Sequence, residues 1–191
     1  IIRNFIDEKY ISKYFDKSIN RNKPYSFVFV GPLISRKSPM VLLKAIKALH
    51  FNYDVNLHFI GDGVLMDKVN LYIKRNNLQK VVKVHGFLSN PYEIVSCSDV
   101  FVLPSHSEGT PRAALEALCL GVPCVLRNVE GNKELKDDKI SNVCLFDNDT
   151  FLPKLMINTA FYSRERMYRS NLLPTAFRSD NILLDYINLL K

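Results

Sequence analysis

The sequence lacks the long apolar runs that would cross a membrane. Its most apolar stretches are FVFVG, LHFIG and VFVLP, all far shorter than the roughly 20 residues that a membrane-spanning helix needs. No charged-then-apolar signal segment opens the chain, which begins at Ile1 without a methionine. We therefore expect neither a membrane span nor an export signal in these 191 residues.

Patterns for metal binding and nucleophilic catalysis are also missing. The four cysteines form no CxxC pair and have no histidine at the spacing of a zinc site, and we expect them to be buried thiols of a cytosolic protein: Cys97, Cys119, Cys124 and Cys144. No Ser-His-Asp or Cys-His arrangement is discernible. The D-x-D at 147–149 follows a predicted strand and is typical of a turn, so we expect no metal and no other cofactor.

Acidic residues are fewer than basic ones, 19 against 26, and the net charge is +7. The basic residues are scattered rather than gathered in one tract, which is typical of a solvated surface and does not favour nucleic-acid binding. An anionic small ligand or an anionic membrane surface would explain the charge equally well. The hydrophobic fraction of 47% and the length of 191 residues are typical of one soluble globular domain, residues 1–191.

Short β-rich runs alternate with amphipathic stretches along most of the chain, as in a parallel sheet covered by helices. The predicted strands span residues 26–30, 55–60, 81–84, 100–103, 123–126 and 142–145. The predicted helices between them span residues 39–49, 64–76, 91–97 and 111–120. We expect an α/β fold with a doubly wound, six-stranded, Rossmann-like parallel sheet in the order 3-2-1-4-5-6.

Both ends of the chain depart from this alternation. Residues 1–20 are expected to form a helical lead-in, with a helix from Asp7 to Phe15. Residues 150–191 are expected to contain only helices, in the stretches PKLMINTAFYS, RERMYRSNLL and NILLDYINLL. Such a C-terminal tail would pack against the core rather than form one.

A doubly wound sheet binds ligands where its strand order reverses, outside the carboxyl ends of the first and fourth strands. The loops at 31–37 and 104–111 follow these strands. The first loop brings two cations, Arg36 and Lys37. In the second, Gly109 lets an anion approach the N–H groups of the helix that follows. Together the two loops predict a phosphate or diphosphate site.

Two carboxylates flank the start of that helix, Glu108 in the loop and Glu116 in the helix. A phosphate would repel them, so we expect both to bind neutral hydroxyl groups instead. A nucleotide sugar carries hydroxyls on its ribose and on its sugar, one on each side of the diphosphate. The two carboxylates therefore match that class of ligand.

The segment EGTPRAALE, residues 108–116, resembles the E-x7-E motif of retaining glycosyltransferases with the GT-B fold, in particular those of family 4. FVFVGPLISRKSP, LHFIGDGVLMDKV, VKVHGFLSN and VLRNVEGNKEL resemble further segments of the same donor-binding domain, and IIRNFIDEKYIS resembles its opening segment. The matching segments follow one another in the same order as in the family, from about residue 2 to residue 147. It covers the donor-binding half alone, and the N-terminal acceptor domain is expected to be absent from this sequence.

The resemblance implies a role for each matching residue. Glu108 would bind hydroxyls of the transferred sugar, Glu116 would bind the ribose, and Lys37 would neutralise the diphosphate. Glu108 and Lys37 are thereby the implied catalytic residues. The implied donor-binding set is Gly31, Arg36, Lys37, Gly86, Phe87, Glu108, Gly109, Thr110, Pro111, Arg112 and Glu116, with residues 86–88 beside the nucleotide base.

One position departs from the family pattern. The family has an arginine directly after the glycine of the first strand, and this chain has Pro32 there. Arg36 and Arg112 are the cations that could replace it. Without a replacement, the loss of one charge-assisted contact would weaken donor binding by about tenfold or more.

The sequence thus predicts a glycosyltransferase domain that binds a nucleotide-diphosphate sugar and transfers the sugar with retention. The alternative is a non-catalytic nucleotide-sugar-binding or scaffold module of the same fold. A nicotinamide-dependent oxidoreductase is disfavoured because GPLISRK, and not G-x-G-x-x-G, follows the first strand. By analogy with the family, we expect a glycan or glycolipid acceptor in polysaccharide biosynthesis, and a cytoplasmic enzyme with peripheral contact to a membrane.

Overall fold

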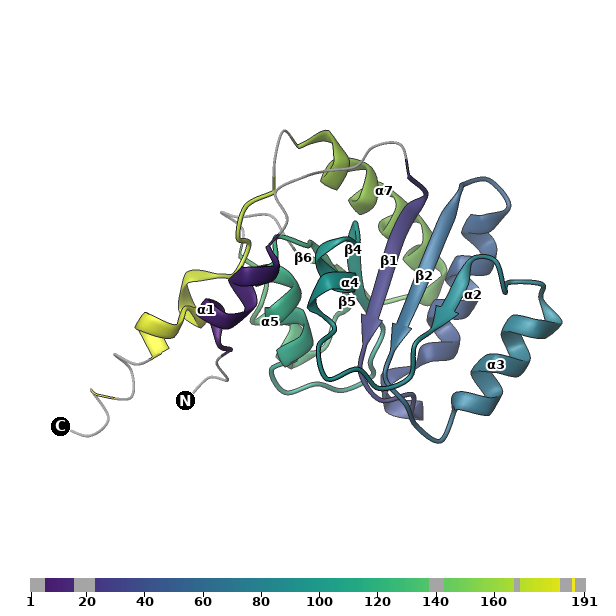
Figure 1. Ribbon diagram of the computed structural model, residues 1–191, viewed down its shortest axis with the longest axis horizontal. Helices are drawn as coiled ribbons and strands as arrows, with labels where there is room; N and C mark the ends of the chain where they lie inside the picture. The colour runs from purple at the N-terminus through teal and green to yellow at the C-terminus, as the bar shows by residue number, and fades with distance from the viewer. Residues whose placement is uncertain (1–5, 16–22, 138–142, 167–168, 183–186, 188–191) are drawn as a thin grey trace.

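The computed structural model describes residues 6–15, 23–137, 143–166, 169–182 and 187. Its centre is one parallel sheet in the order β3-β2-β1-β4-β5-β6 (Figure 1). The strands are β1 Tyr25–Val30, β2 Val55–Ile60, β3 Val82–Val84, β4 Val100–Leu103, β5 Cys124–Arg127 and β6 Val143–Phe146. The predicted fold class and strand order are confirmed, and each predicted strand end lies within one residue of the observed one.

Helices cover both faces of the sheet, as right-handed crossovers require. On one face α2 (Pro39–His50) packs on α3 (Met66–Arg75) and on α7 (Leu152–Glu165). On the other face α5 (Arg112–Cys119) packs between α4 (Tyr92–Ser96) and α1 (Glu8–Ile11). The remaining short elements are η1 Ser12–Tyr14, η2 Ser35–Lys37, α6 Glu130–Lys133, η3 Asp149–Phe151 and η4 Thr175–Phe177.

The core lies on both sides of the sheet, which explains why the strands read as nearly continuous apolar runs. All four residues of β4 are buried. Phe29 of β1 and Phe59 of β2 are fully buried and meet edge to face, with ring centroids 5.4 Å apart. In α2 the residues Leu42, Ile46 and Leu49 repeat at helical spacing and are buried against the sheet.

The expectation that residues 150–191 contain only helices is partly wrong. The first stretch forms α7, but residues 169–174 are not helical. Their backbone and side chains bond to distant residues instead: Leu172 N–H donates to the Leu118 carbonyl over 2.8 Å, and Arg169 donates to two carbonyls near α4. Pro174 also opposes helix continuation. Most of the third stretch lies outside the described residues.

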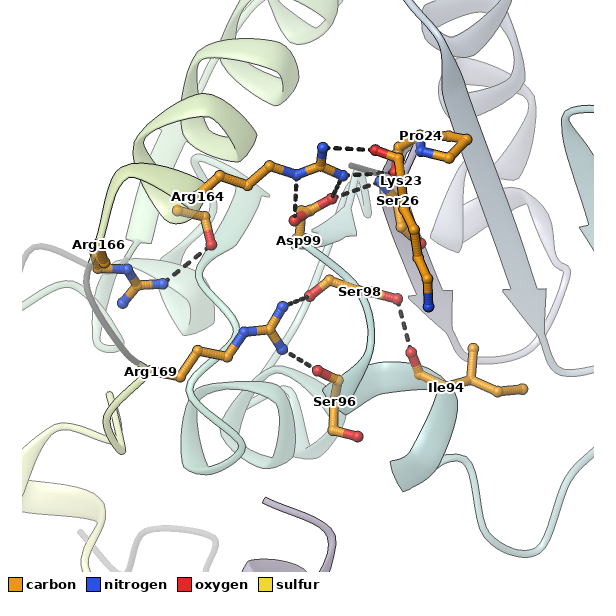
Figure 2. A network of polar contacts seen from close by, with 11 residues as sticks. Lys23, Pro24, Ser26, Ile94, Ser96, Ser98, Asp99, Arg164, Arg166 and Arg169 are labelled. Carbon is orange, nitrogen blue, oxygen red and sulfur yellow. Dashed lines mark hydrogen bonds and ion pairs between the residues drawn. The ribbon is translucent and has the colours of Figure 1, made fainter. Parts of the chain in front are cut away.

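Two arginines of the C-terminal segment are buried rather than solvated, which corrects the expectation for the basic residues (Figure 2). Arg164 donates to both carboxylate oxygens of Asp99, over 2.9 and 2.7 Å, and to the carbonyls of Lys23 and Pro24. Arg169 donates to the carbonyls of Ser96 and Ser98. These contacts fasten α7 and the following segment to the edge of the sheet where β1 and β4 begin.

The cysteines only partly match their prediction. All four are free thiols, and Cys119 and Cys124 are buried. Cys144 is half-buried, and Cys97 is exposed because it caps the end of the short helix α4 at the surface.

The predicted helical lead-in begins with a helix that is shorter than expected. Asp7 caps α1 by accepting a hydrogen bond from the Tyr10 N–H over 2.9 Å. The chain then tightens into the 3-10 turn η1, and residues 16–20 of the predicted lead-in lie outside the described residues.

Candidate functional site

The loops after β1 and β4 lie side by side at the carboxyl edge of the sheet, as the strand order dictates. A backbone hydrogen bond joins them directly, from the His106 N–H to the Arg36 carbonyl over 2.9 Å. The loops after β2 and β3 lie beside this pair. Gly61 packs so closely on Gly31 that an added Cβ would overlap the Gly31 carbonyl, and its N–H donates to Gly86 over 2.7 Å.

An ion pair joins the first two loops at the switch point of the sheet, in the region bounded by residues 31–37 and 104–111 that we call the crevice. Lys37 Nζ lies 2.6 Å from Oε1 of Glu108. The Lys37 side chain is 12% exposed and the Glu108 side chain 7% exposed. Because both groups are largely shielded from water, this pair is stronger than a surface ion pair. The structure therefore brings together the two residues that the sequence assigned to catalysis.

Arg36 lies beside the same carboxylate. Its guanidinium donates to the Ser107 carbonyl over 2.7 Å and lies 3.6 Å from Oε2 of Glu108. The side chain is 49% exposed, so it borders the crevice and solvent together. Pro32, which stands at the position of the family arginine, is exposed and offers no charge. Of the two predicted replacements, Arg36 is the one beside Lys37.

The helix α5 begins at Arg112, directly after this loop, with Pro111 as its N-cap. Pro111 provides no side-chain cap for the first N–H groups of the helix. Gly109 is exposed, and an added Cβ there would meet no atom within 4 Å. The start of α5 thus presents backbone donors and the positive end of the helix dipole next to the two cations.

Glu116 lies one helical turn further along α5 and has its own surroundings. The Tyr92 hydroxyl donates to Oε1 of Glu116 over 3.5 Å. Burial raises the pKa of the Glu116 carboxyl, while the positive charge of Arg112 and the Tyr92 hydroxyl lower it. Burial and the Glu116 charge together raise the pKa of Tyr92 to about 12. Arg112 therefore acts electrostatically on Glu116.

Three tyrosine rings pack together next to Glu116. Tyr92 lies 6.1 Å from Tyr10 and 5.5 Å from Tyr14, measured between ring centroids. Asn90 donates to the Tyr14 hydroxyl over 2.7 Å, which fixes the loop that follows β3. In that loop Phe87 is 79% exposed, and its ring faces solvent at the carboxyl edge. An apolar and aromatic surface thus adjoins the carboxylate of Glu116.

Sequence reasoning missed three residues of this region. Ser107 accepts the Arg36 hydrogen bond, and Tyr92 contacts Glu116. Gly131 packs so closely on the Glu108–Gly109 backbone that an added Cβ would overlap the Gly109 carbonyl. Of these three, only Gly131 has a signal in the sequence, because it belongs to VLRNVEGNKEL, a segment that resembles the glycosyltransferase family.

Within the described part of the chain, no group of three or more His, Cys, Asp and Glu side chains could hold a metal ion. The D-x-D segment forms a turn, as predicted. Its Asp149 pairs with Arg127 over 2.5 Å, Asp147 accepts a hydrogen bond from Asn128, and Asn148 caps η3.

Two cavities lie away from the crevice. One, of about 280 Å³, opens at the edge where β1 and β4 begin and includes His58, Asp99, Arg164 and Arg169 in its lining. The other, of about 300 Å³, lies between β6 and α7. The arginines of the first cavity are engaged with Asp99 and with carbonyls, whereas the crevice brings Lys37 and Arg36 together with Glu108.

None of the helices in the described ranges is long and apolar enough to cross a membrane.

The fold and the crevice define the class of this protein: a doubly wound α/β domain with an anion-compatible crevice at its switch point. Residues 11–151 match the family described as "Glycosyl transferases group 1". The chain belongs to this family.

Curated relatives agree with this assignment. The chain is 37% identical over 142 residues to the Escherichia coli UDP-Gal:alpha-D-GlcNAc-diphosphoundecaprenol alpha-1,3-galactosyltransferase, an alignment that covers 70% of this chain and 37% of the relative. It is 31% identical over 139 residues to the Staphylococcus aureus capsular polysaccharide biosynthesis glycosyltransferase CapH, covering 70% and 38%. The chain therefore spans less than two-fifths of the length of these relatives.

Solved structures show the same fold. The Anabaena Alr3699/HepE protein in complex with UDP and glucose has a TM-score of 0.79 at 19% identity, covering 99% of this chain and 55% of that one. The S. aureus protein TarM has a TM-score of 0.75 at 18% identity, covering 100% of this chain and 38% of that one.

Proposed function

We propose that this chain is the donor-binding part of a retaining glycosyltransferase. The observation that carries the proposal is the pairing of Lys37 and Arg36 with Glu108 at the switch-point crevice. The second carboxylate, Glu116, lies in the helix α5 that follows the Glu108 loop. Membership of the family and a UDP complex of a protein with the same fold support it. The ligand would be a nucleotide-diphosphate sugar.

The diphosphate would lie between Lys37, Arg36 and the start of α5. Gly109, Thr110 and Pro111 form the approach to the N–H groups of this helix, where negative charge is stabilised by the helix dipole. Gly31 follows β1 directly, and no side chain fits at Gly61 beside it, because a Cβ at Gly61 would overlap the Gly31 carbonyl. Two cations and the helix start together offset the charge that a diphosphate brings.

The two carboxylates would bind hydroxyl groups on either side of the diphosphate. Glu116 suits the ribose, because it lies beside Tyr92 and Arg112 rather than beside Lys37 and Arg36. Glu108 suits the transferred sugar. Gly86 and the exposed ring of Phe87 would lie beside the base, where an aromatic face stacks without demanding one particular base.

In the reaction, the bond between the sugar C1 and the β-phosphate oxygen would break, and the diphosphate would leave with the electron pair. An acceptor hydroxyl would form the new bond on the same face of the sugar and pass its proton to the departing diphosphate oxygen, which lies on that face. Charge develops on the leaving oxygen, so preorganised cations and the helix start supply the stabilisation without a metal ion. Lys37 acts on the leaving group, and Glu108 holds the sugar.

The acceptor would be a glycan or glycolipid. The names of the relatives mention a diphosphoundecaprenol acceptor and a capsular polysaccharide. Activity would need an acceptor-binding domain in addition to these 191 residues, because the chain matches only 37% of the length of the E. coli relative. A lipid-linked acceptor would bring the enzyme to the cytoplasmic face of a membrane as a peripheral protein.

A non-catalytic nucleotide-sugar-binding or scaffold module is the second candidate, and Pro32 is the residue that favours it. The position of Arg36 beside Lys37 argues for the enzyme, because a second cation is present at the crevice despite the proline.

Calorimetric titration of the folded chain with UDP, GDP and ADP sugars tests the proposal. We expect one nucleotide series to bind, and Glu116→Ala to weaken that binding by about tenfold or more, because the ribose hydroxyls lose a charged acceptor. Glu165→Ala is the matched control, since this carboxylate is exposed at the end of α7 on the opposite face of the sheet. A folded chain that binds no member of the panel contradicts the proposal.

A further inference from the structure

One carboxylate faces both cations of the crevice and offsets part of their charge. Glu108 binds Lys37 at 2.6 Å through one oxygen and lies 3.6 Å from Arg36 through the other. Both cations belong to the single turn η2, so they face Glu108 as a unit. The Glu108 side chain is only 7% exposed, and its two oxygens point toward positive charge rather than toward solvent.

The same groups have separate partners in the proposed donor complex. The cations would bind the diphosphate, and Glu108 would bind sugar hydroxyls. A diphosphate bound to Lys37 and Arg36 would draw on the same positive charge as Glu108 and would bring negative charge close to its carboxylate. The diphosphate and Glu108 therefore compete for Lys37 and Arg36.

We propose that the donor diphosphate displaces Glu108 from Lys37 and Arg36, and that this exchange frees the Glu108 carboxylate to bind the sugar. The proposal rests on the donor-binding function proposed above. It makes Arg36 the second phosphate-binding cation of this chain, and it makes Glu108 an internal competitor of the diphosphate. Sugar binding by Glu108 then follows from diphosphate binding instead of preceding it.

The contacts of Arg36 permit this exchange. A guanidinium has five N–H donors, and only one contact of Arg36, to the Ser107 carbonyl, is a hydrogen bond of normal length. With 49% of the side chain exposed, the remaining donors can reach a phosphate while the Ser107 bond is kept. Lys37 has three rotatable donors on a flexible stem, so a small rotation moves one from Glu108 to a phosphate oxygen.

The exchange predicts that one substitution changes the affinity for two ligands by different factors. In Glu108→Gln the cations lose their charged competitor, so the nucleoside diphosphate without a sugar should bind about five- to tenfold more tightly. The corresponding nucleotide sugar should gain less or bind more weakly, because the sugar loses a charged acceptor. The affinity ratio of nucleotide sugar to nucleoside diphosphate therefore falls in this variant.

The test is calorimetric titration of the wild type, Glu108→Gln and Glu116→Gln with the diphosphate among UDP, GDP and ADP that the wild type binds, and with its sugar conjugate. Glu116→Gln is the matched control, since it should weaken both ligands through the ribose. If Glu108→Gln does not fold, Glu108→Asp takes its place: it keeps the charge but shortens the side chain, so the diphosphate should bind more tightly by a smaller factor.

The outcomes distinguish a failure of the exchange from a failure of the proposed donor-binding function. Tighter diphosphate binding in Glu108→Gln supports the exchange. Weaker or unchanged diphosphate binding overturns the exchange and leaves the donor-binding function standing, because the wild type still binds the ligand. A wild type that binds no nucleoside diphosphate and no nucleotide sugar overturns both.

Discussion

Among the single residues, Glu116 carries a cost in stability that its proposed role in ribose binding would explain. Its carboxyl is half-buried on α5, and burial is the largest influence that raises its pKa. Arg112 and the Tyr92 hydroxyl recover part of that cost by favouring the charged form. A carboxylate kept in such surroundings without strong partners is typical of a site that awaits hydrogen-bond donors from a ligand.

Replacing Glu116 by glutamine should stabilise the fold at neutral pH. Because the folded pKa is raised, the folded state keeps a proton that the unfolded chain has already lost. This contribution to stability is present below the ordinary value of 4.5 and is lost as the pH rises through the raised folded pKa. Urea unfolding of the wild type and Glu116→Gln over a range of pH measures it.

The expected result is a free-energy difference in favour of Glu116→Gln that grows with pH across that window and then levels off. Other titrating groups cancel in the comparison because both proteins share them. A difference that stays constant across the acid range contradicts the assignment of a raised pKa.

At the scale of elements, the crevice depends on the close packing of loops from several strands. The turn α6, after β5, lies directly on the Glu108–Gly109 backbone at Gly131. No side chain fits there, since even a Cβ would overlap the Gly109 carbonyl. The backbone that carries Glu108 is thus held in place by the backbone of a neighbouring loop.

Gly131→Ala should therefore destabilise the fold by about 1–3 kcal/mol, as overpacking against backbone does. Gly109→Ala is the matched control, because the added methyl group would meet no atom within 4 Å, and it should change stability by less than about 1 kcal/mol. Denaturant unfolding of both variants measures the difference. Equal stability of the two variants contradicts the close packing of α6 on the loop.

At the scale of the whole molecule, most of the fold could be predicted from the sequence because it depends on local patterns. Alternating apolar strands and amphipathic helices gave the elements, and the handedness of crossovers gave the strand order. The 169–174 segment could not be predicted, since its hydrogen bonds go to residues such as Ser98 and Leu118, far away in the chain.

The candidate site could likewise be predicted from the sequence only in part. Lys37, Arg36 and Glu108 lie in the loops that follow two predicted strands. The strand order alone therefore places these loops together. Tyr92 could not be found, because its contact with Glu116 depends on how α4 packs on α5. Packing between helices depends on the shapes of the side chains, and these leave no periodic pattern in a single sequence.

Positively charged side chains lie at both ends of the parallel strands, so an anion has two places where it could bind. The proposed function requires that a nucleotide bind at the carboxyl ends. The carboxyl edge has the crevice with Lys37 and Glu108, and the opposite edge has the cavity lined by Arg164 and Arg169 (Figure 2). The arginines of that cavity already bond to Asp99 and to carbonyls. We therefore expect a nucleotide to choose the carboxyl edge.

The most direct measurement is a map of backbone amide NMR shifts during titration with the nucleoside diphosphate that the chain binds. We expect the largest changes in residues 31–37, 86–88 and 108–116, at the carboxyl edge. Changes centred instead on residues 96–99 and 164–169, or no localised changes at saturating ligand, would contradict this expectation.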